Sequence, residues 1–175
     1  QQQTQTPNIG EDILMMQMNV SNVGIQNESL KRLSNFATNE KNRVAIAATG
    51  GIDAILLAMQ RHASNADVQE NGCGALINLA TNENNQALIA AAGGIDTILL
   101  AMQWHVSNAY VQSYGCGALQ NLSVNYKNKG AIVAAGGINR VMMAMRNHVF
   151  NPFILIFGFG ALWKLTLSDR NKGCY

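Results

Sequence analysis

The stretch NGCGALINLATNENNQALIAAAGG (residues 71–94) decides the fold, because it returns 43 residues later as YGCGALQNLSVNYKNKGAIVAAGG (residues 114–137). Over the full period, residues 51–93 and 94–136 are identical at 28 of 43 positions. A period of about 40 to 47 residues is typical of stacked helical repeats. The chain is therefore predicted to be an array of 43-residue units.

Four such units account for almost the whole chain. Gly-Ile-Asp or Gly-Ile-Asn opens the units 51–93, 94–136 and 137–175, and residues 8–50 form a diverged copy that we expect to lack its first helix. The fourth unit is predicted to be truncated or uncapped. Residues 1–7 are polar and are predicted to be a disordered N-terminal segment.

Within one unit the apolar residues recur at steps of three and four, which is the spacing of helices. We expect helices near 52–62, from about 66 to 80 and near 84–92, ending at the Gly93-Gly94 pair, which permits a positive φ. The capping-type residues Ser64-Asn65 precede the longest helix. Extended over the chain, this pattern predicts about eleven helices and no strands.

Composition narrows the class of protein. The chain has 175 residues, 48% of them hydrophobic and 13% charged, with a net charge of +2. These values exclude a disordered protein and give no electrostatic reason to expect nucleic acid or a membrane surface as the partner. The longest apolar stretch, 153–163, is about half the ~20 residues of a membrane-spanning helix. The positions of Cys73 and Cys116 in apolar helices suit buried, reduced thiols. We therefore expect an intracellular protein that is located in the cytoplasm, with the nucleus as an alternative location.

The two stretches quoted above resemble armadillo repeats, and the resemblance extends over about residues 8–167. The shared pattern is a third helix of the form G/A-C-x-A-L-x-N-L-A, an asparagine-rich turn, a short first helix and a Gly-Gly break. The resemblance implies an all-α, right-handed α-solenoid. It also implies that the third helices line a concave groove that binds an extended peptide or a partner protein.

In armadillo proteins the asparagine of the third helix projects into the groove and bonds the backbone of the ligand. The positions that match are Asn35, Asn78 and Asn121, with Lys164 in the fourth unit. A carboxamide both donates and accepts, so it pairs with a peptide group whatever the side chain of the ligand. The alternative is that each asparagine only holds its own neighbouring loop.

The groove face implied by this resemblance differs from unit to unit. The second unit offers Asp67, Glu70 and Asn71, whereas later units offer the aromatic residues Tyr110, Tyr114 and Phe157. We therefore expect the groove to change from polar to aromatic toward its carboxyl end, with an apolar anchor of the ligand near Tyr114 and Phe157. Gly74, Gly117 and Gly160 interrupt these helices, which indicates the close approach of either a ligand or the next helix, and we expect close packing of the next helix.

No residue pattern indicates catalysis. His62, His105 and His148 recur once per unit, which separates neighbours by about 8 to 10 Å, too far to share a zinc ion. We expect them to act at helix ends. The sequence therefore predicts a protein that is not an enzyme, with no metal, cofactor or small-molecule substrate.

The leading interpretation is a protein-binding scaffold whose partner is a protein or an extended peptide. The alternative is a structural subunit that self-assembles, end to end or as a dimer, through the apolar fourth unit. A possible homo-oligomer follows from residues 149–163, which are apolar on more than one helical face.

Overall fold

The computed structural model describes residues 8–167, and within this range the chain is all-α, with eleven helices and no strands. The predictions of an all-α fold and of about eleven helices are confirmed. The helices are α1 (Ile9–Met18), α2 (Val23–Phe36), α3 (Glu40–Ala48), α4 (Gly51–Arg61), α5 (Ala66–Leu79), α6 (Glu83–Ala91), α7 (Gly94–Trp104), α8 (Ala109–Leu122), α9 (Tyr126–Ala134), α10 (Gly137–Asn147) and α11 (Pro152–Thr166).

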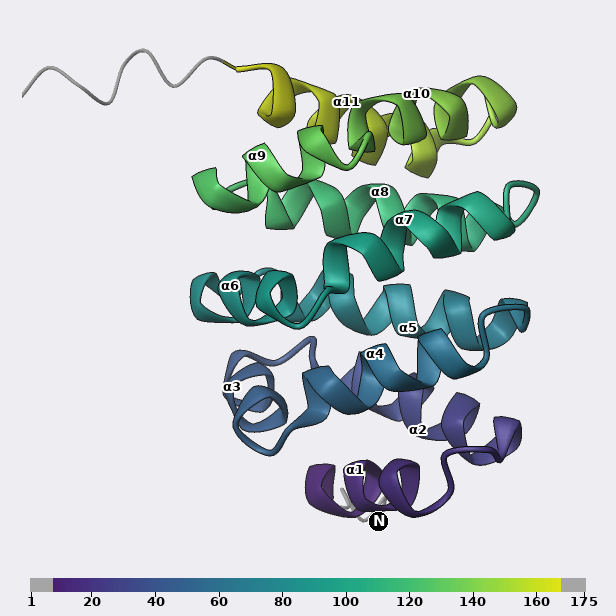
Figure 1. Cartoon of the computed structure of the whole chain (residues 1–175), viewed down its shortest axis with the longest axis vertical. Coiled ribbons are helices and arrows are strands. Elements are labelled where there is room, and N and C mark those ends of the chain that lie inside the picture. The colour runs from purple at the N-terminus through teal and green to yellow at the C-terminus, as the bar shows by residue number, and fades with distance from the viewer. Residues whose placement is uncertain (1–7, 168–175) are drawn as a thin grey trace, which may run out of the picture.

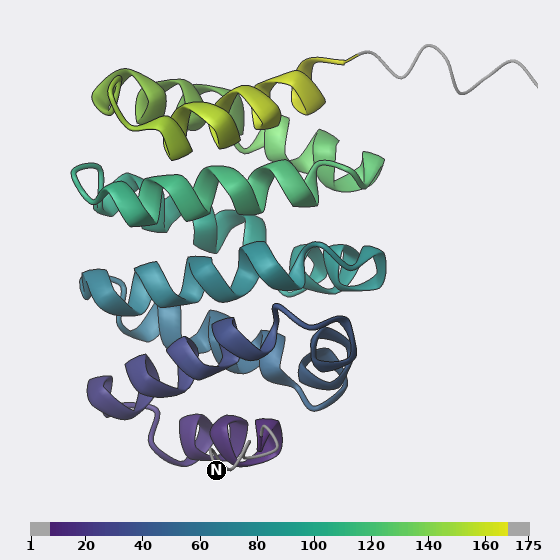
Figure 2. The ribbon, with the colours of Figure 1, turned by 180° about the vertical axis from the view of Figure 1, so that it is seen from behind.

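The helices form an elongated stack in which each unit packs on the next one (Figure 1). The long helices α2, α5, α8 and α11 lie side by side and make the most extensive contacts of the structure (Figure 2). On the other side of the stack, α1, α4, α7 and α10 form a second layer, and the short helices α3, α6 and α9 lie along one edge. We call the exposed side of α2, α5, α8 and α11 the third-helix face.

Asparagine begins every helix that does not begin with glycine. The side chain of the N-cap asparagine accepts a hydrogen bond from a backbone N–H in the first turn of each of these eight helices, as Asn65 does from Val68 at 3.0 Å. These bonds satisfy donors that a helix start leaves unpaired. The asparagine-rich composition of the turns is thus a set of helix start signals.

The Gly-Gly pairs begin the remaining three helices, and their two glycines are needed for different reasons. Gly50, Gly93 and Gly136 have φ values of 78°, 82° and 81°, which favour glycine. At Gly94 the reason is space, because a Cβ atom there would lie 2.7 Å from the backbone oxygen of Ile89. The predicted positive φ at the break is confirmed.

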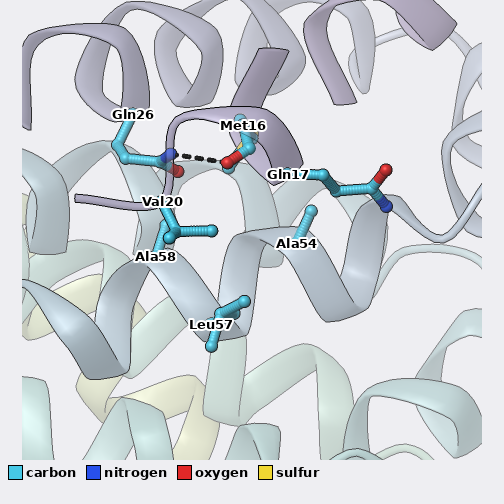
Figure 3. A pocket seen from close by; sticks show the side chains of 7 residues that line it. All are labelled: Met16, Gln17, Val20, Gln26, Ala54, Leu57 and Ala58. Carbon is cyan, nitrogen blue, oxygen red and sulfur yellow. Dashed lines mark hydrogen bonds between the residues drawn. The ribbon is translucent and has the colours of Figure 1, made fainter. Parts of the chain in front are cut away.

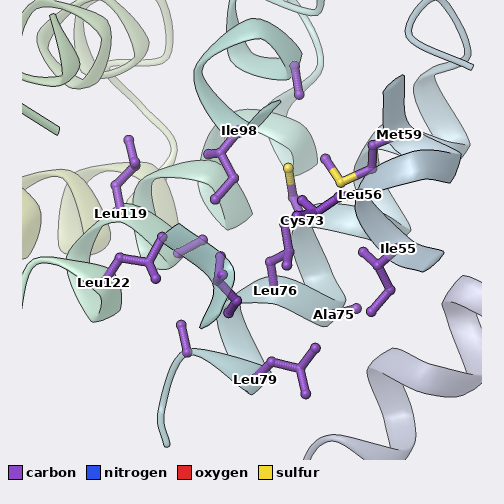
Figure 4. Close-up of a cluster of buried hydrophobic side chains, with 14 of the residues drawn as sticks. Ile55, Leu56, Met59, Cys73, Ala75, Leu76, Leu79, Ile98, Leu119 and Leu122 are labelled. Carbon is purple, nitrogen blue, oxygen red and sulfur yellow. The ribbon is translucent and has the colours of Figure 1, made fainter. Parts of the chain in front are cut away.

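The core runs continuously from unit to unit between the two layers (Figure 4). Ile55, Leu76 and Leu79 are completely buried, and so are Leu119 and Leu122 one unit later. Each unit therefore buries its apolar residues on its neighbours, which is why a short unit of 43 residues does not need a core of its own.

Residues 8–50 contain α1, α2 and α3. α1 lies 43 residues before α4 and is its equivalent, so the described chain opens at a helix of the second type and not at a short first helix. The short helix stands at the end of the unit, where Asn39 caps its start. The predicted disorder of residues 1–7 lies outside the described residues, as does the structure of residues 168–175.

No single helix between residues 8 and 167 is long and apolar enough to cross a membrane. The helix pairs α3 with α4 and α6 with α7 reach the required length and hydropathy only when both helices of a pair are counted together. The two helices of each pair are bent relative to one another by 75° and 74°.

The third-helix face as the candidate binding site

The predicted asparagines connect neighbouring long helices. The Nδ2 of Asn78 donates to the backbone oxygen of Ser34 at 3.0 Å, and the Nδ2 of Asn121 donates to that of Ile77 at 2.9 Å. Each bond joins residues 44 positions apart and therefore crosses from one unit to the preceding one. The asparagines thus do not hold their own loops, which was the alternative to a ligand-binding role.

Each of these carboxamides retains bonding capacity. An asparagine offers two N–H donors and one acceptor oxygen, and each inter-unit bond uses one donor. Within residues 8–167 the Oδ1 atoms of Asn78 and Asn121 accept no hydrogen bond, and both side chains are half-buried. The unused groups of these two carboxamides can bond a ligand in addition to the preceding helix.

The first and last matching residues behave differently. Asn35 is exposed, and no described residue bonds its side chain. Lys164 replaces the asparagine in α11, and its Nζ donates to the backbone oxygen of Gln120 at 3.3 Å, again 44 positions away. Partial burial lowers the pKa of the Lys164 ammonium group. The lysine therefore keeps the inter-unit bond but adds a positive charge.

The polar part of the face lies on α2 and α5. The Nδ2 of Asn71 donates to the Oδ1 of Asn27 at 2.7 Å, so this predicted site residue also links two helices. Asp67 is exposed, whereas Glu70 is half-buried. Burial raises the pKa of the Glu70 carboxyl group, and the nearby Asp67 carboxylate raises it further.

The aromatic part of the face lies on α8 and α11. The rings of Tyr110 and Tyr114 have centroids 6.2 Å apart and an interplanar angle of 39°, within the range of favourable aromatic pairs. Tyr110 is 60% exposed and Tyr114 is half-buried. Burial raises the pKa of the Tyr114 hydroxyl group, with smaller contributions from Glu70 and Tyr110. Tyr114 therefore joins the polar part of the face to the aromatic part.

The helix glycines provide space for the next unit. A Cβ atom on Gly74 would lie 3.5 Å from the ring of Tyr114, and one on Gly117 would lie 3.4 Å from the ring of Phe157. Each ring thus packs over a glycine of the preceding unit, and the expectation that these glycines serve close packing is confirmed. Phe153 and Ile156 flank Phe157 and are 63% and 64% exposed.

The histidines form a separate set of inter-unit bonds. The Nε2 atoms of His62, His105 and His148 lie 2.9, 2.7 and 2.8 Å from the backbone oxygens of Val20, Ala63 and Val106. Because a carbonyl oxygen only accepts, each Nε2 carries the proton. Each histidine is also the C-cap residue of its helix, so the expected position at a helix end is confirmed.

The structural role of a set of buried glutamines was not predicted from the sequence. Gln26, Gln69 and Gln112 are 2% exposed, and the Nε2 of each donates to two backbone oxygens at the end of the preceding helix. Their recurrence at 43-residue intervals was the available signal. The two buried cysteines behave as expected for inert thiols, since burial raises the pKa of both Cys73 and Cys116 to about 12.

Four hollows between residues 8 and 167 are lined mainly by helices other than α2, α5, α8 and α11. The one drawn in Figure 3 lies between α1 and α4, and Gln26 bonds Met16 across its edge. Its volume of about 10 Å³ is close to the smallest that can hold one water molecule. Three larger hollows, of about 310, 370 and 470 Å³, lie between α4 and α7, between α3 and the start of α6, and between α7 and α10.

Comparison with models of known protein families finds no match, and comparison with curated proteins finds none either. A similar solved structure is described as the crystal structure of an engineered protein, a target of the Northeast Structural Genomics Consortium. It shares 21% sequence identity with this chain at a TM-score of 0.76, over 89% of this chain and 62% of that chain. The likeness supports the helical fold, and this chain spans less than two thirds of the engineered protein.

Proposed function

We propose that the chain is an armadillo-type, right-handed α-solenoid that binds an extended segment of a partner protein along its third-helix face. The observation that carries this proposal is the regular placement of half-buried carboxamides with unused acceptors. Asn78 and Asn121 are held in register by equivalent bonds to the preceding helix, so their free groups recur at equivalent positions of successive units.

The spacing of these groups suits an extended chain. Neighbouring packed helices lie about 8 to 10 Å apart, and two residues of an extended peptide span about 6.6 to 7 Å. Successive carboxamides can therefore reach backbone groups of roughly every second residue of the ligand. Because backbone bonds do not depend on the ligand sequence, specificity has to come from the side chains beside them.

The neighbouring side chains favour a ligand with an apolar or aromatic anchor. Tyr110 and Phe153 are exposed on α8 and α11, and Tyr114 and Phe157 form the partly buried floor beside them. Exposed aromatic residues on a rigid support are common energetic centres of protein interfaces. The carboxylates of Asp67 and Glu70 favour polar or basic residues in the part of the ligand that lies over α5.

The same interpretation proposes a protein without catalytic activity, cofactor or metal, acting inside the cell, in the cytoplasm or nucleus. This part of the proposal is supported by the contacts that the candidate histidines and cysteines already make within the protein. The histidines bond backbone oxygens, and the two described cysteines are buried without a disulfide.

A peptide display selection on the intact chain tests this proposal, followed by affinity measurements with variants. Tyr110→Ala and Asn35→Ala remove exposed groups of the face and break none of the inter-unit bonds described above. Tyr126→Ala is the matched control, because Tyr126 is 66% exposed on α9, outside the face. We expect at least a tenfold loss of affinity for Tyr110→Ala, a smaller loss for Asn35→Ala and no change for the control.

Equal affinity of all three variants for the selected peptides would contradict the assignment of the face. A triple replacement of Asn35, Asn78 and Asn121 by alanine is less suitable, because it also removes two bonds between units. Its effect on binding is informative only beside its free energy of unfolding.

A further inference from the structure

The hollow between α4 and α7 belongs to the second layer of the stack, on the other side from the third-helix face (Figure 1). We call it the α4–α7 hollow and define it by Ala63, Gln69, Leu100 and Trp104. Its volume of about 310 Å³ lies at the lower end of the range for small-molecule sites. Of the eight residues that line it, five are apolar and none is charged. Such a lining fits an uncharged, mainly apolar ligand.

The same hollow exists one unit earlier, where it is almost closed. The seven residues that line the hollow of Figure 3 lie 43 positions before seven of those that line the α4–α7 hollow. The volume there is about 10 Å³ instead of about 310 Å³. Val20 stands at the position of Ala63, and valine has two more side-chain carbon atoms than alanine. The hollow is therefore a feature of the repeat that the second and third units open.

A tryptophan beside the hollow is not needed for packing between units. Trp104 corresponds to Arg61 one unit earlier and to Asn147 one unit later. Ala63 is valine in the two equivalent turns, at position 20 and at Val106. The small residue and the aromatic residue therefore coincide at one of three equivalent places. Because the stack is built equally well with arginine or asparagine at this position, the tryptophan is available for another role.

Two large apolar side chains beside the hollow are left open to water. Leu100 and Trp104 lie one turn apart on α7 and are 54% and 62% exposed. A ligand that covers them removes apolar surface from water. Aromatic rings also pack favourably on one another in offset or edge-to-face arrangements. The pair therefore favours a flat, aromatic ligand.

Gln69 supplies a polar group at the inner end of the hollow. Its Nε2 donates to the backbone oxygens of Met59 and His62, so both of its N–H groups are used. Between residues 8 and 167 no group donates to its Oε1, and the residue is only 2% exposed while it lines the hollow. Buried acceptors are generally paired. A ligand with one N–H or O–H group would provide the missing donor.

The volume of the hollow sets the size of the ligand. An apolar cavity of about 150 Å³ is large enough to bind benzene. The α4–α7 hollow has about twice this volume. A ligand of two fused rings therefore fits, with its donor on one edge and its apolar face against Trp104.

We propose that the α4–α7 hollow binds a small, uncharged aromatic molecule of two fused rings that carries one N–H or O–H donor. The rings pack against Leu100 and Trp104, and the donor bonds the Oε1 of Gln69. This site goes beyond the proposed function, because it uses other helices than the third-helix face. A protein partner and the small molecule can therefore be bound at the same time.

Indole is the probe, because it has two fused rings and one N–H donor. The intact, isotope-labelled chain is titrated with indole while nuclear magnetic resonance follows the side-chain N–H signals of its two tryptophans. The Trp104→Phe and Trp163→Phe variants assign these signals. We expect a saturable shift of the Trp104 signal and no shift of the Trp163 signal. N-methylindole lacks the donor and is expected to bind roughly fivefold more weakly.

A substitution that the repeat itself supplies tests the location. Ala63→Val gives the hollow the valine of the equivalent turns, so the backbone accepts it, and we expect roughly a tenfold or greater loss of indole affinity because the space is filled. Ala90→Val is the matched control. Ala90 lies on α6 outside the hollow and is Val133 in the next unit, so the affinity is expected to stay unchanged.

Several results would overturn the proposal. These are the absence of a saturable Trp104 shift up to the solubility limit of indole, equal responses of both tryptophans, and unchanged binding to Ala63→Val. Equal affinities for indole and N-methylindole would overturn the assigned ligand class, because Gln69 would then contribute nothing. The comparison of the two ligands uses the unmodified chain and decides the question even if Ala63→Val does not fold.

Discussion

At the scale of single residues, buried side-chain amides connect the elements of this molecule. Gln69 is the clearest example, because its Nε2 donates to the backbone oxygens of Met59 and His62 at 2.9 and 3.0 Å and is closed off from water. These oxygens lie at the end of α4, where helical carbonyls lose their partners. The amide therefore caps one helix from the side of the next.

Replacing Gln69 by leucine should be strongly destabilising. The apolar side chain fills similar space but leaves the buried backbone oxygen of Met59 without a donor, while the oxygen of His62 still accepts from the backbone N–H of Asn65. We expect a cost of about 1 to 3 kcal/mol in the free energy of unfolding. Urea unfolding followed by circular dichroism measures this value. Gln60→Leu is the control, because Gln60 is exposed and bonds only the Thr97 hydroxyl group. Equal losses for both variants would refute the capping role.

Glu70 gives a prediction that depends on pH. Burial and Asp67 raise the pKa of this carboxyl group above the usual value of 4.5, so the folded state binds the proton more tightly than the unfolded state does. Ionisation of Glu70 therefore lowers stability as pH rises through the folded-state pKa, and the penalty is absent below about pH 4.5. Glu70→Gln should raise the melting temperature at pH 7 and have no effect at pH 3.

The size of this effect is modest, about a few tenths of a kcal/mol, because Glu70 is only partly buried, so that water weakens both the desolvation penalty and the repulsion from Asp67. Glu83→Gln serves as a contrast in the same melting experiments. Glu83 lies in the first turn of α6, where a negative charge is favourable, so its neutralisation should lower the melting temperature at pH 7. A Glu70→Gln variant with no gain at pH 7 would show that the carboxylate is not destabilising.

At the scale of helices, glycine has two distinct structural roles, and alanine substitution separates them. At Gly74, in the middle of α5, a Cβ atom would lie 3.2 Å from the Ser34 hydroxyl group, which can rotate, and 3.5 Å from Tyr114. At Gly94, the first residue of α7, it would lie 2.7 Å from the backbone oxygen of Ile89, which cannot move freely.

We therefore expect opposite results. Gly74→Ala should stabilise the protein by up to about 1 kcal/mol, the difference in helix propensity between the two residues. Gly94→Ala should destabilise it by about 2 kcal/mol or more, because the helix start has to shift. Denaturant unfolding of the two variants measures both values. Destabilisation of similar size at both sites would mean that Gly74 also lacks room for a methyl group.

The helices were largely predictable from the sequence, and the contacts of their side chains were not. Periodicity and the Gly93-Gly94 break place the helix ends to within about a residue, because capping and φ preferences are local properties. The partners of Asn78 and His62 were not predictable, because each bond joins residues in different units. The sequence shows that a position recurs but not which atom it meets in the neighbouring unit.

At the scale of the whole molecule, stability should vary along the stack. The inner helices α5 and α8 are packed between long helices on both sides, whereas α2 and α11 have such a neighbour on one side only within residues 8–167. Interactions in repeat arrays are limited to adjacent units, so the end units can open without disrupting the middle. The fourth unit is further weakened because Leu155 replaces the capping glutamine.

Amide hydrogen exchange should therefore reveal a gradient. We expect the greatest protection in α5 and α8, lower protection in α1 and α2, and the lowest at the end of α10, whose carbonyl groups lack the glutamine donor present at α4 and α7. The measurement is mass spectrometry of peptides after timed exchange. Uniform protection along the chain would instead show that the four units unfold as one cooperative body.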